Sequence, residues 1–166
     1  MDVECVIKLV TIGEAGSGKT TLISSFCEQV KTPSYQPTIG VEFNVLYLNR
    51  NAKKYKLQFW DTAGQECFAP IVRSYYKNIA GVFYVIDLTC LKSIKKIDYW
   101  LKQFNTHQNC PAKMIVIGNK CNSRERIISK EEMIEKFPTA RTFPQIILNG
   151  EAIGGYDNFA DWSSVE

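Results

Sequence analysis

The chain alternates between short apolar runs and segments in which apolar residues recur every three or four positions. Runs of this length, bounded by turn-forming residues, are typical of buried β-strands. They cover residues 6–12, 41–48, 55–61, 81–88, 113–118 and 144–148. The helical spacing predicts helices over residues 19–27, 66–77, 91–107 and 130–137, with a last helix beginning near Tyr156. Strands that alternate with helices predict an α/β fold, with a mainly parallel sheet covered by helices on both faces.

Three local signals refine this prediction. Residues 49–52 (NRNA) are turn-like, so the second and third strands are predicted to form an antiparallel hairpin. In the helix over 91–107, five apolar side chains from Ile94 to Phe104 form one stripe, which indicates a core face rather than a cofactor site. Ser129 is placed to cap the helix over 130–137.

Composition indicates one folded domain. The chain has 166 residues, of which 45% are hydrophobic and 22% charged, enough for a core and too few for two full domains. A net charge of +3 is too small to indicate a nucleic-acid surface. The six cysteines are spaced too widely for a Cys-x-x-Cys redox pair or a zinc knuckle. The opening stretch MDVECVIKLV is too charged for a secretory peptide and no apolar run is long enough for a membrane span, so reduced thiols in the cytoplasm are expected.

The segment GEAGSGKTT, residues 13–21, carries the strongest chemical signal. It follows the first strand, opens a helix and fits the pattern G-x-x-x-x-G-K-[ST]. Backbone N–H groups around the glycines can converge on a phosphate, and the start of the helix adds its positive dipole end. The strand–loop–helix context favours nucleotide binding over a chance glycine-rich turn. The predicted phosphate-binding residues are Glu14, Ala15, Gly16, Ser17, Gly18, Lys19, Thr20 and Thr21.

A second signal, WDTAGQE, follows at the end of the third strand. Asp61 can hold the water shell of a metal ion, Gly64 can bring its N–H close to a terminal phosphate, and Gln65 can orient a water molecule. A D-x-x-G pattern alone is weak evidence, because it occurs by chance in many chains. At this distance behind a phosphate-binding loop it is strong.

The motifs GEAGSGKT, PTIG, WDTAGQE and NKCN stand in the order and spacing of the Ras-superfamily small GTPases, which the chain resembles over residues 5–122. Within that superfamily, IGVEF, WDTAGQE and IVRSYY resemble the Rab family. The resemblance implies the P-loop NTPase fold, GTP or GDP with Mg²⁺ as ligands, slow GTP hydrolysis and a role as a molecular switch in vesicle trafficking.

The resemblance also implies a role for each matching residue. Thr38 would bind Mg²⁺ and contact the γ-phosphate as the switch-I threonine. The implied catalytic residues are Lys19, Thr38 and Gln65. The implied metal ligands are Thr20, Thr38 and, through water, Asp61. The implied base-binding residues are Asn119, Lys120 and Asn122.

Implied partners are effectors, an exchange factor and a GTPase-activating protein, which would bind the switch regions of a monomer. Phe43, Trp60 and Tyr75 fall where Rab proteins carry an aromatic triad that effectors contact. Ordinary packing between the hairpin and the second helix is an equal alternative for these three side chains. The last residues, DWSSVE, contain no cysteine for a prenyl group, so membrane association would require a lipidated tail beyond Glu166.

Three features on the guanine side depart from the family. Asn122 replaces the aspartate of N-K-x-D, Lys31 stands where an aromatic usually stacks on the base, and the Ser-Ala-Lys loop is not visible. An aspartate accepts two hydrogen bonds from guanine, whereas the NH₂ of Asn122 would face another donor. Losing a charge-assisted hydrogen bond costs about 1.5–3 kcal/mol, roughly tenfold to more than a hundredfold in affinity. Because xanthine has a carbonyl at C2, weakened guanine preference with gained xanthine tolerance is one hypothesis; an asparagine that only caps the loop is the other.

The end of the chain, from residue 140 onward, resembles the second half of a glutaredoxin. Pro144 would be its cis-proline, and Gly154, Gly155 and Asp157 would help to hold glutathione. The N-terminal cysteine motif of that family is missing, so residues 144–148 are interpreted as the last strand of a single domain over 1–166, followed by a glycine-rich loop. Two other functions stay open: a nucleotide-insensitive interaction module, and a glutathione-linked redox protein, which the cysteine spacing nearly excludes.

Overall fold

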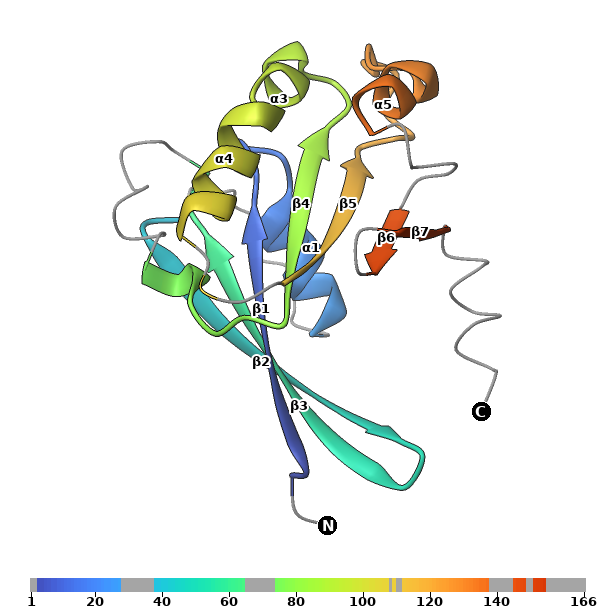
Figure 1. Cartoon of the computed structure of the whole chain (residues 1–166). Helices are drawn as coiled ribbons and strands as arrows, with labels where there is room; N and C mark the ends of the chain where they lie inside the picture. Colours follow the sequence, from blue (N-terminus) through green and yellow to red (C-terminus); the bar gives the residue numbers. More distant parts are fainter. Residues whose placement is uncertain are drawn as a thin grey trace.

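A twisted sheet forms the centre of the molecule (Figure 1). The computed structural model describes residues 3–27, 38–64, 74–107, 109, 112–137, 145–148 and 151–154. Within these ranges seven strands form one sheet in the order β2-β3-β1-β4-β5-β6-β7. The strands are β1 (Cys5–Ile12), β2 (Val41–Arg50), β3 (Lys53–Thr62), β4 (Gly81–Asp87), β5 (Lys113–Asn119), β6 (Gln145–Leu148) and β7 (Glu151–Gly154). All six predicted strands are confirmed, with bounds within two residues of the prediction.

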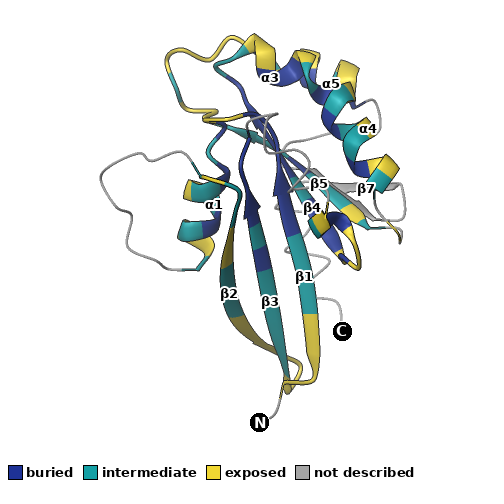
Figure 2. Ribbon diagram, turned by 90° about the vertical axis from the view of Figure 1, so that its left-hand side faces the viewer, coloured by how far each residue is buried: buried dark blue, intermediate teal, exposed yellow. Residues whose placement is uncertain are grey.

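The helices lie on both faces of the sheet, α1 on one side and α3 and α4 on the other (Figure 2). The described helices are α1 (Lys19–Phe26), α3 (Leu91–Lys95), α4 (Ile97–His107) and α5 (Lys130–Lys136), with a short 3₁₀ helix, η2 (Ser74–Tyr76). The α/β prediction is therefore confirmed. Most of the predicted helix over 66–77 and the helix expected near Tyr156 lie outside the described residues.

The helix predicted over 91–107 is divided in two. Lys96 ends α3 with φ −90° and ψ 2°, and α4 starts at the next residue. The division allows the two parts to contact different structures: Ser93 in α3 accepts a hydrogen bond from the backbone N–H of Asp87, while Trp100 and Phe104 in α4 are buried against the sheet. The sequence showed the apolar stripe correctly as core, but it gave no sign of the break.

The central strands are parallel, and the hairpin is antiparallel as predicted. β1 lies between β3 and β4 and is parallel to both, and β4 is parallel to β5. β2 and β3 pair from Val41↔Thr62 to Arg50↔Lys53. The two residues between them, Asn51 and Ala52, have φ of 49° and 57°. Positive φ at both positions is the geometry of a type I′ turn, whose twist matches that of the flanking strands.

The end of the chain extends the same sheet beyond β5. β6 runs antiparallel to β5, with Ile115 opposite Ile146, and β7 runs antiparallel to β6. Part of the segment predicted as a glycine-rich loop therefore forms β7. These two pairings are added to the antiparallel pair of the hairpin.

Packing on the α3 and α4 face buries the main core. Its largest fully buried side chains are Trp100, Tyr76, Tyr84, Phe104 and several isoleucines.

Ser129 caps α5 as predicted. Its hydroxyl accepts from the Glu132 N–H at 3.1 Å, and the Glu132 carboxylate accepts from the Ser129 N–H at 2.7 Å. No helix among the described residues has the length and apolar character needed to cross a membrane.

Candidate functional site

The predicted functional residues gather where the parallel strands end. Thr11 in β1 lies opposite Asp61 in β3, and Asp87 in β4 lies opposite Asn119 in β5. The carboxyl ends of β1, β3, β4 and β5 therefore share one edge of the sheet, which is where α/β folds bind ligands. The loop over 13–18 crosses this edge before α1 begins.

Glycines give that loop its shape. Gly13, Gly16 and Gly18 have φ of 138°, 76° and 92°, a region that other L-residues rarely adopt. A Cβ on Gly13 would clash with the carbonyl oxygen of Val85, so the loop lies directly against β4. Within the part of the chain that the structure describes, no side chain hydrogen-bonds to the first turn of α1. The first N–H groups of a helix lack intrahelical partners and are typical ligands of anions, as the motif predicts.

Lys19 is held inside the loop. Its Nζ donates to the carbonyl oxygens of Gly13 at 2.9 Å and Glu14 at 2.8 Å, and the residue is 5% exposed. Burial lowers the pKa of Lys19 to about 8, although the carboxylates of Asp61 and Glu14 oppose the shift. A buried ammonium that donates to two carbonyl oxygens is well suited to donate to phosphate oxygens instead.

The three predicted metal ligands come together beside Lys19. The Thr20 hydroxyl donates to Asp61 Oδ2 at 2.5 Å and lies 3.0 Å from the Thr38 hydroxyl. Asp61 is fully buried, and burial raises the pKa of its carboxyl against the hydrogen bonds from Thr20 and Thr11 and the charge of Lys19. A buried carboxylate with two hydroxyls offers the oxygen donors that Mg²⁺ prefers. The described residues contain no cluster of three or more His, Cys, Asp or Glu.

Sequence reasoning missed Thr11, which fixes Asp61. The Thr11 hydroxyl donates to Asp61 Oδ1 at 2.9 Å and accepts from the Thr62 N–H at 3.3 Å. Its polar side chain at the end of an apolar strand was a signal, but only the β1–β3 register shows which carboxylate it contacts.

Gly64 lies directly against the loop over 13–18. Its carbonyl oxygen accepts from the N–H of Ala15 at 3.1 Å, and a Cβ at Gly64 would clash with the backbone of Ala15 and Glu14. Gly64 is therefore close to the phosphate-binding loop, and the contact of its N–H with a terminal phosphate stays a prediction. Gln65, the predicted catalytic residue, lies outside the described residues.

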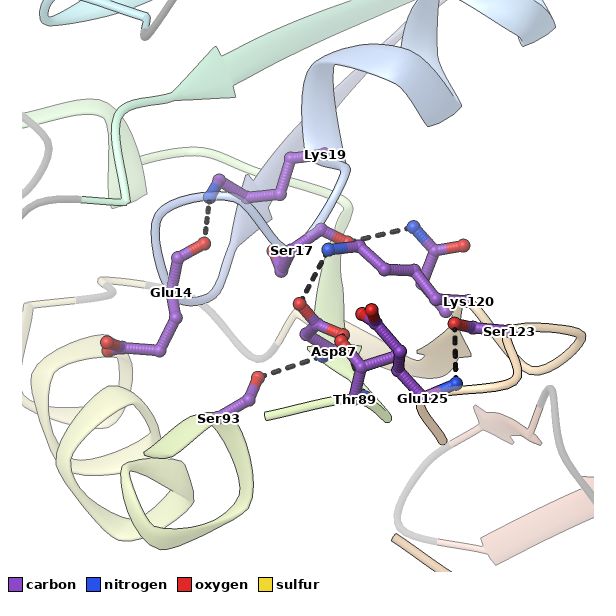
Figure 3. A network of polar contacts seen from close by, with 10 residues as sticks. Glu14, Ser17, Lys19, Asp87, Thr89, Ser93, Lys120, Ser123 and Glu125 are labelled. Carbon is purple, nitrogen blue, oxygen red and sulfur yellow. Dashed lines mark hydrogen bonds and ion pairs between the residues drawn. The ribbon is translucent and has the colours of Figure 1, made fainter. Parts of the chain in front are cut away.

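The loop after β5 is tied to the rest of the site on two sides (Figure 3). Asn119 donates from Nδ2 to the carbonyl oxygen of Ser17 at 2.8 Å. Lys120 has φ 60°, and its Nζ lies 2.6 Å from Asp87 Oδ2. Burial alone would raise the pKa of Asp87, but hydrogen bonds from Lys120 and Thr89 outweigh it and lower that pKa.

Asn122 is exposed at the tip of this loop. Its Oδ1 accepts from the Cys121 thiol at 3.5 Å. The turn itself is closed by the Ser123 N–H, which donates to the carbonyl oxygen of Lys120 at 3.0 Å. Among the described residues the loop is thus closed by a backbone hydrogen bond and not by the side chain of Asn122.

The side chain of Glu14 was not singled out by sequence reasoning. Its Oε1 accepts from Trp100 Nε1 at 2.9 Å, and its Oε2 lies 3.0 Å from Lys92 Nζ. The sequence placed Trp100 in the core stripe, which is correct. A buried indole also needs a hydrogen-bond acceptor, and that requirement was the available signal.

The predicted aromatic triad packs together as a cluster. Trp60 lies between Phe43 and Tyr75, with ring centroids 4.9 Å and 4.7 Å away, and Lys8 Nζ lies 5.1 Å from the Trp60 ring centroid. Phe43 is 48% exposed and neighbouring Ile39 is 81% exposed. Packing of the triad is therefore observed, and its contact with a partner stays a prediction.

Other predicted positions are not described by the structure. These are Lys31, Pro144, Gly155 and Asp157; Gly154 is the last residue of β7. Of the cysteines, Cys5, Cys27, Cys90 and Cys121 are described, and all four are free thiols. The resemblance of the tail to glutaredoxin stays untested.

Comparison with known proteins agrees with this geometry. The sequence model of the Ras family matches residues 8–142. The chain is 36% identical over 129 residues to the Ras-related protein SEC4 of Saccharomyces cerevisiae, covering 78% of this chain and 60% of SEC4. It is 36% identical over 143 residues to the Ras-related protein Rab-10 of Diplobatis ommata, covering 84% of this chain and 72% of Rab-10. Rab-8 of the same organism is 39% identical over 127 residues, covering 76% of this chain and 60% of Rab-8. The chain belongs to the Ras family and is Rab-like.

Proposed function

We propose that this protein binds GTP or GDP with Mg²⁺ and acts as a slowly hydrolysing molecular switch. The observation that carries this proposal is the convergence of Lys19, Thr20, Thr38 and Asp61 beside an uncapped helix N-terminus. One part of the cluster suits phosphate and the other suits a hard cation, and the two lie side by side. Both are needed for a nucleoside triphosphate with its metal ion.

Each residue has a role in this proposal. Lys19 exchanges the carbonyls of Gly13 and Glu14 for β- and γ-phosphate oxygens. The hydroxyls of Thr20 and Thr38 and, through water, the carboxylate of Asp61 hold Mg²⁺, which neutralises charge on the phosphates when bound. Gln65 orients the attacking water. The sequence offers no evident catalytic arginine, so intrinsic hydrolysis is slow and an activating partner is needed.

Switching follows from residues that contact both the site and the surface. Thr38 and Gly64 lie at the ends of the segments that a γ-phosphate orders in such switches, and both contact the site here. Effectors and regulators then bind near these residues, at the exposed Phe43 and the half-buried Trp60 and Tyr75. The pairing of β6 with β5 supports a single domain that includes the tail.

The base preference is expected to differ from that of the family. Asn122 is exposed and does not close its own loop, which supports a role in ligand recognition over a purely structural one. With Asn122 in place of an aspartate, guanine binding is weakened and xanthine is tolerated, because the amide can donate to the xanthine C2 carbonyl.

The test is a titration of nucleotide-free protein with GDP, XDP and ADP, each with and without Mg²⁺. Binding of GDP or XDP that strengthens with Mg²⁺ and is lost in Lys19→Ala supports the proposal. Lys95→Ala is the matched control, since Lys95 is an exposed lysine on α3. Uptake of nucleoside diphosphate by Lys19→Ala at the wild-type level would refute the phosphate-site assignment.

A second candidate is a degenerate family member that serves as a nucleotide-insensitive interaction module. The departures at Asn122 and Lys31 favour it, whereas the intact phosphate and metal residues oppose it. The same titration decides between the two, because the second candidate requires that wild-type protein bind none of the three nucleotides.

A further inference from the structure

Glu14 joins the phosphate-binding loop to the helices on the far side of the site. Its carboxylate is almost fully buried, at 6% exposure for the residue, and contacts Trp100 of α4 and Lys92 of α3 at 2.9 Å and 3.0 Å. In Figure 3 the Glu14 side chain extends away from Lys19 and toward these helices. A buried carboxylate is costly unless it is both paired and hydrogen-bonded, and here it is both.

The backbone of the same residue contacts the phosphate-binding side of the loop. The carbonyl oxygen of Glu14 accepts from Lys19 Nζ at 2.8 Å, and the next N–H, that of Ala15, donates to Gly64 at 3.1 Å. One residue is therefore fixed by α3 and α4 through its side chain and contacts the key ammonium through its backbone. A shift of the carboxylate would move the carbonyl that positions Lys19.

α3 holds the other loop of the site as well. Ser93, next to Lys92, accepts from the Asp87 N–H at 2.9 Å, and Asp87 pairs with Lys120 at 2.6 Å. The end of α3 at Lys96 separates this short helix from the packed α4. Two adjacent residues of α3 thus contact different parts of the site. Lys92 pairs with Glu14 of the phosphate-binding loop, and Ser93 contacts Asp87, which pairs with Lys120 of the loop after β5.

We propose that Glu14 is a positioning residue through which Trp100 and Lys92 hold the phosphate-binding loop in the conformation that accepts a diphosphate. This inference rests on the proposed nucleotide binding. It attributes part of the diphosphate affinity to the contacts of the Glu14 carboxylate. Glu14 does not touch the phosphates with its side chain; it acts through the backbone of the loop. Loosening the carboxylate from either helix therefore weakens diphosphate binding.

For Glu14→Gln, a purely electrostatic role and a positioning role predict opposite changes in diphosphate affinity. Removing the negative charge in Glu14→Gln takes an anion away from a phosphate site, so charge alone would strengthen binding. Positioning predicts weaker binding, because the ion pair with Lys92 is lost. Trp100→Phe changes no charge. It removes the N–H from which Glu14 accepts, together with the second ring of a fully buried indole, so its urea midpoint is measured beside its affinity. If Glu14 is a positioning residue, Trp100→Phe also weakens diphosphate binding.

The experiment measures the affinity of nucleotide-free protein for GDP and XDP and for the corresponding monophosphates by competition. The variants are Glu14→Gln, Trp100→Phe and Lys92→Met, and Lys95→Met is the control on the same helix. Each of the three variants should lose about tenfold in diphosphate affinity, the effect of one charge-assisted hydrogen bond. Monophosphate affinity should change less than threefold, a selectivity that general loss of structure would not produce. The double variant Glu14→Gln with Lys92→Met should lose no more than the larger single loss.

Two results would overturn the inference while leaving the proposed function intact. One is diphosphate binding in Trp100→Phe and Glu14→Gln that stays within twofold of the Lys95→Met control. The other is an equal loss for mono- and diphosphates together with a lowered urea midpoint of the nucleotide-free protein, which indicates a structural role only. Failure of wild-type protein to bind any diphosphate would instead refute the proposed function, and the inference with it.

Discussion

Restoring a carboxylate at position 122 should reverse the base preference. In Asn122→Asp the side chain can only accept hydrogen bonds, so it pairs with the two donors of guanine and repels the C2 carbonyl of xanthine. One charge-assisted bond is worth about 1.5–3 kcal/mol. Asn122 is exposed, which places the gain at the lower end, about tenfold for GDP. A comparable loss for XDP would change the GDP-to-XDP affinity ratio by about a hundredfold.

The assay is a competition titration of GDP and XDP against a fluorescent nucleotide at constant Mg²⁺ and salt. Asn122→Ala is the control, because the alanine side chain can neither donate nor accept a hydrogen bond. It should weaken the binding of both GDP and XDP, and its GDP-to-XDP affinity ratio should lie between those of wild type and Asn122→Asp. A ratio that differs by less than threefold between wild type and Asn122→Asp would refute the reasoning. It would mean that Asn122 does not face the base.

Three further predictions concern stability and close packing. Gly64→Ala should lower the free energy of unfolding of nucleotide-free protein by about 1–3 kcal/mol, because the added methyl group would clash with the backbone of Ala15 and Glu14; an unchanged urea midpoint would contradict that contact. The pKa of Asp87 is lowered from 3.8 in the folded protein, so its contribution is present above that value and is lost as pH falls through the folded pKa. Asp87→Asn should therefore be less stable than wild type near neutral pH, and urea unfolding at decreasing pH should show the gap closing; a gap independent of pH would contradict this. Ser129→Ala should cost about 1 kcal/mol by removing the cap of α5, and urea unfolding should show a smaller loss in Ser129→Thr, which keeps a capping hydroxyl.

Local patterns were enough to predict the phosphate side of the site. The glycines, Lys19 and Thr20 lie within one strand–loop–helix unit, and the conformation of such a unit depends on neighbours in sequence. Asp61 could be added because it ends an adjacent strand. Strand positions were predicted well for the same reason, since each strand is a short apolar run between turn signals.

Contacts between distant segments could not be predicted in the same way. Trp100 is 86 residues from the Glu14 carboxylate that accepts its hydrogen bond, and Thr11 is 50 residues from Asp61. Only strand register and helix packing bring these pairs together. The break at Lys96 also escaped prediction, because the apolar stripe continues across it without interruption.

The hydrogen bond between the Ala15 N–H and the Gly64 carbonyl has a consequence for ligand entry. An amide that already donates to Gly64 is not free for a phosphate oxygen, so a ligand that needs this amide must first displace Gly64. The two arrangements exclude each other. A ligand that uses this amide therefore binds more weakly by the free energy of the Gly64 contact that it displaces. A ligand that does not need this amide avoids the penalty.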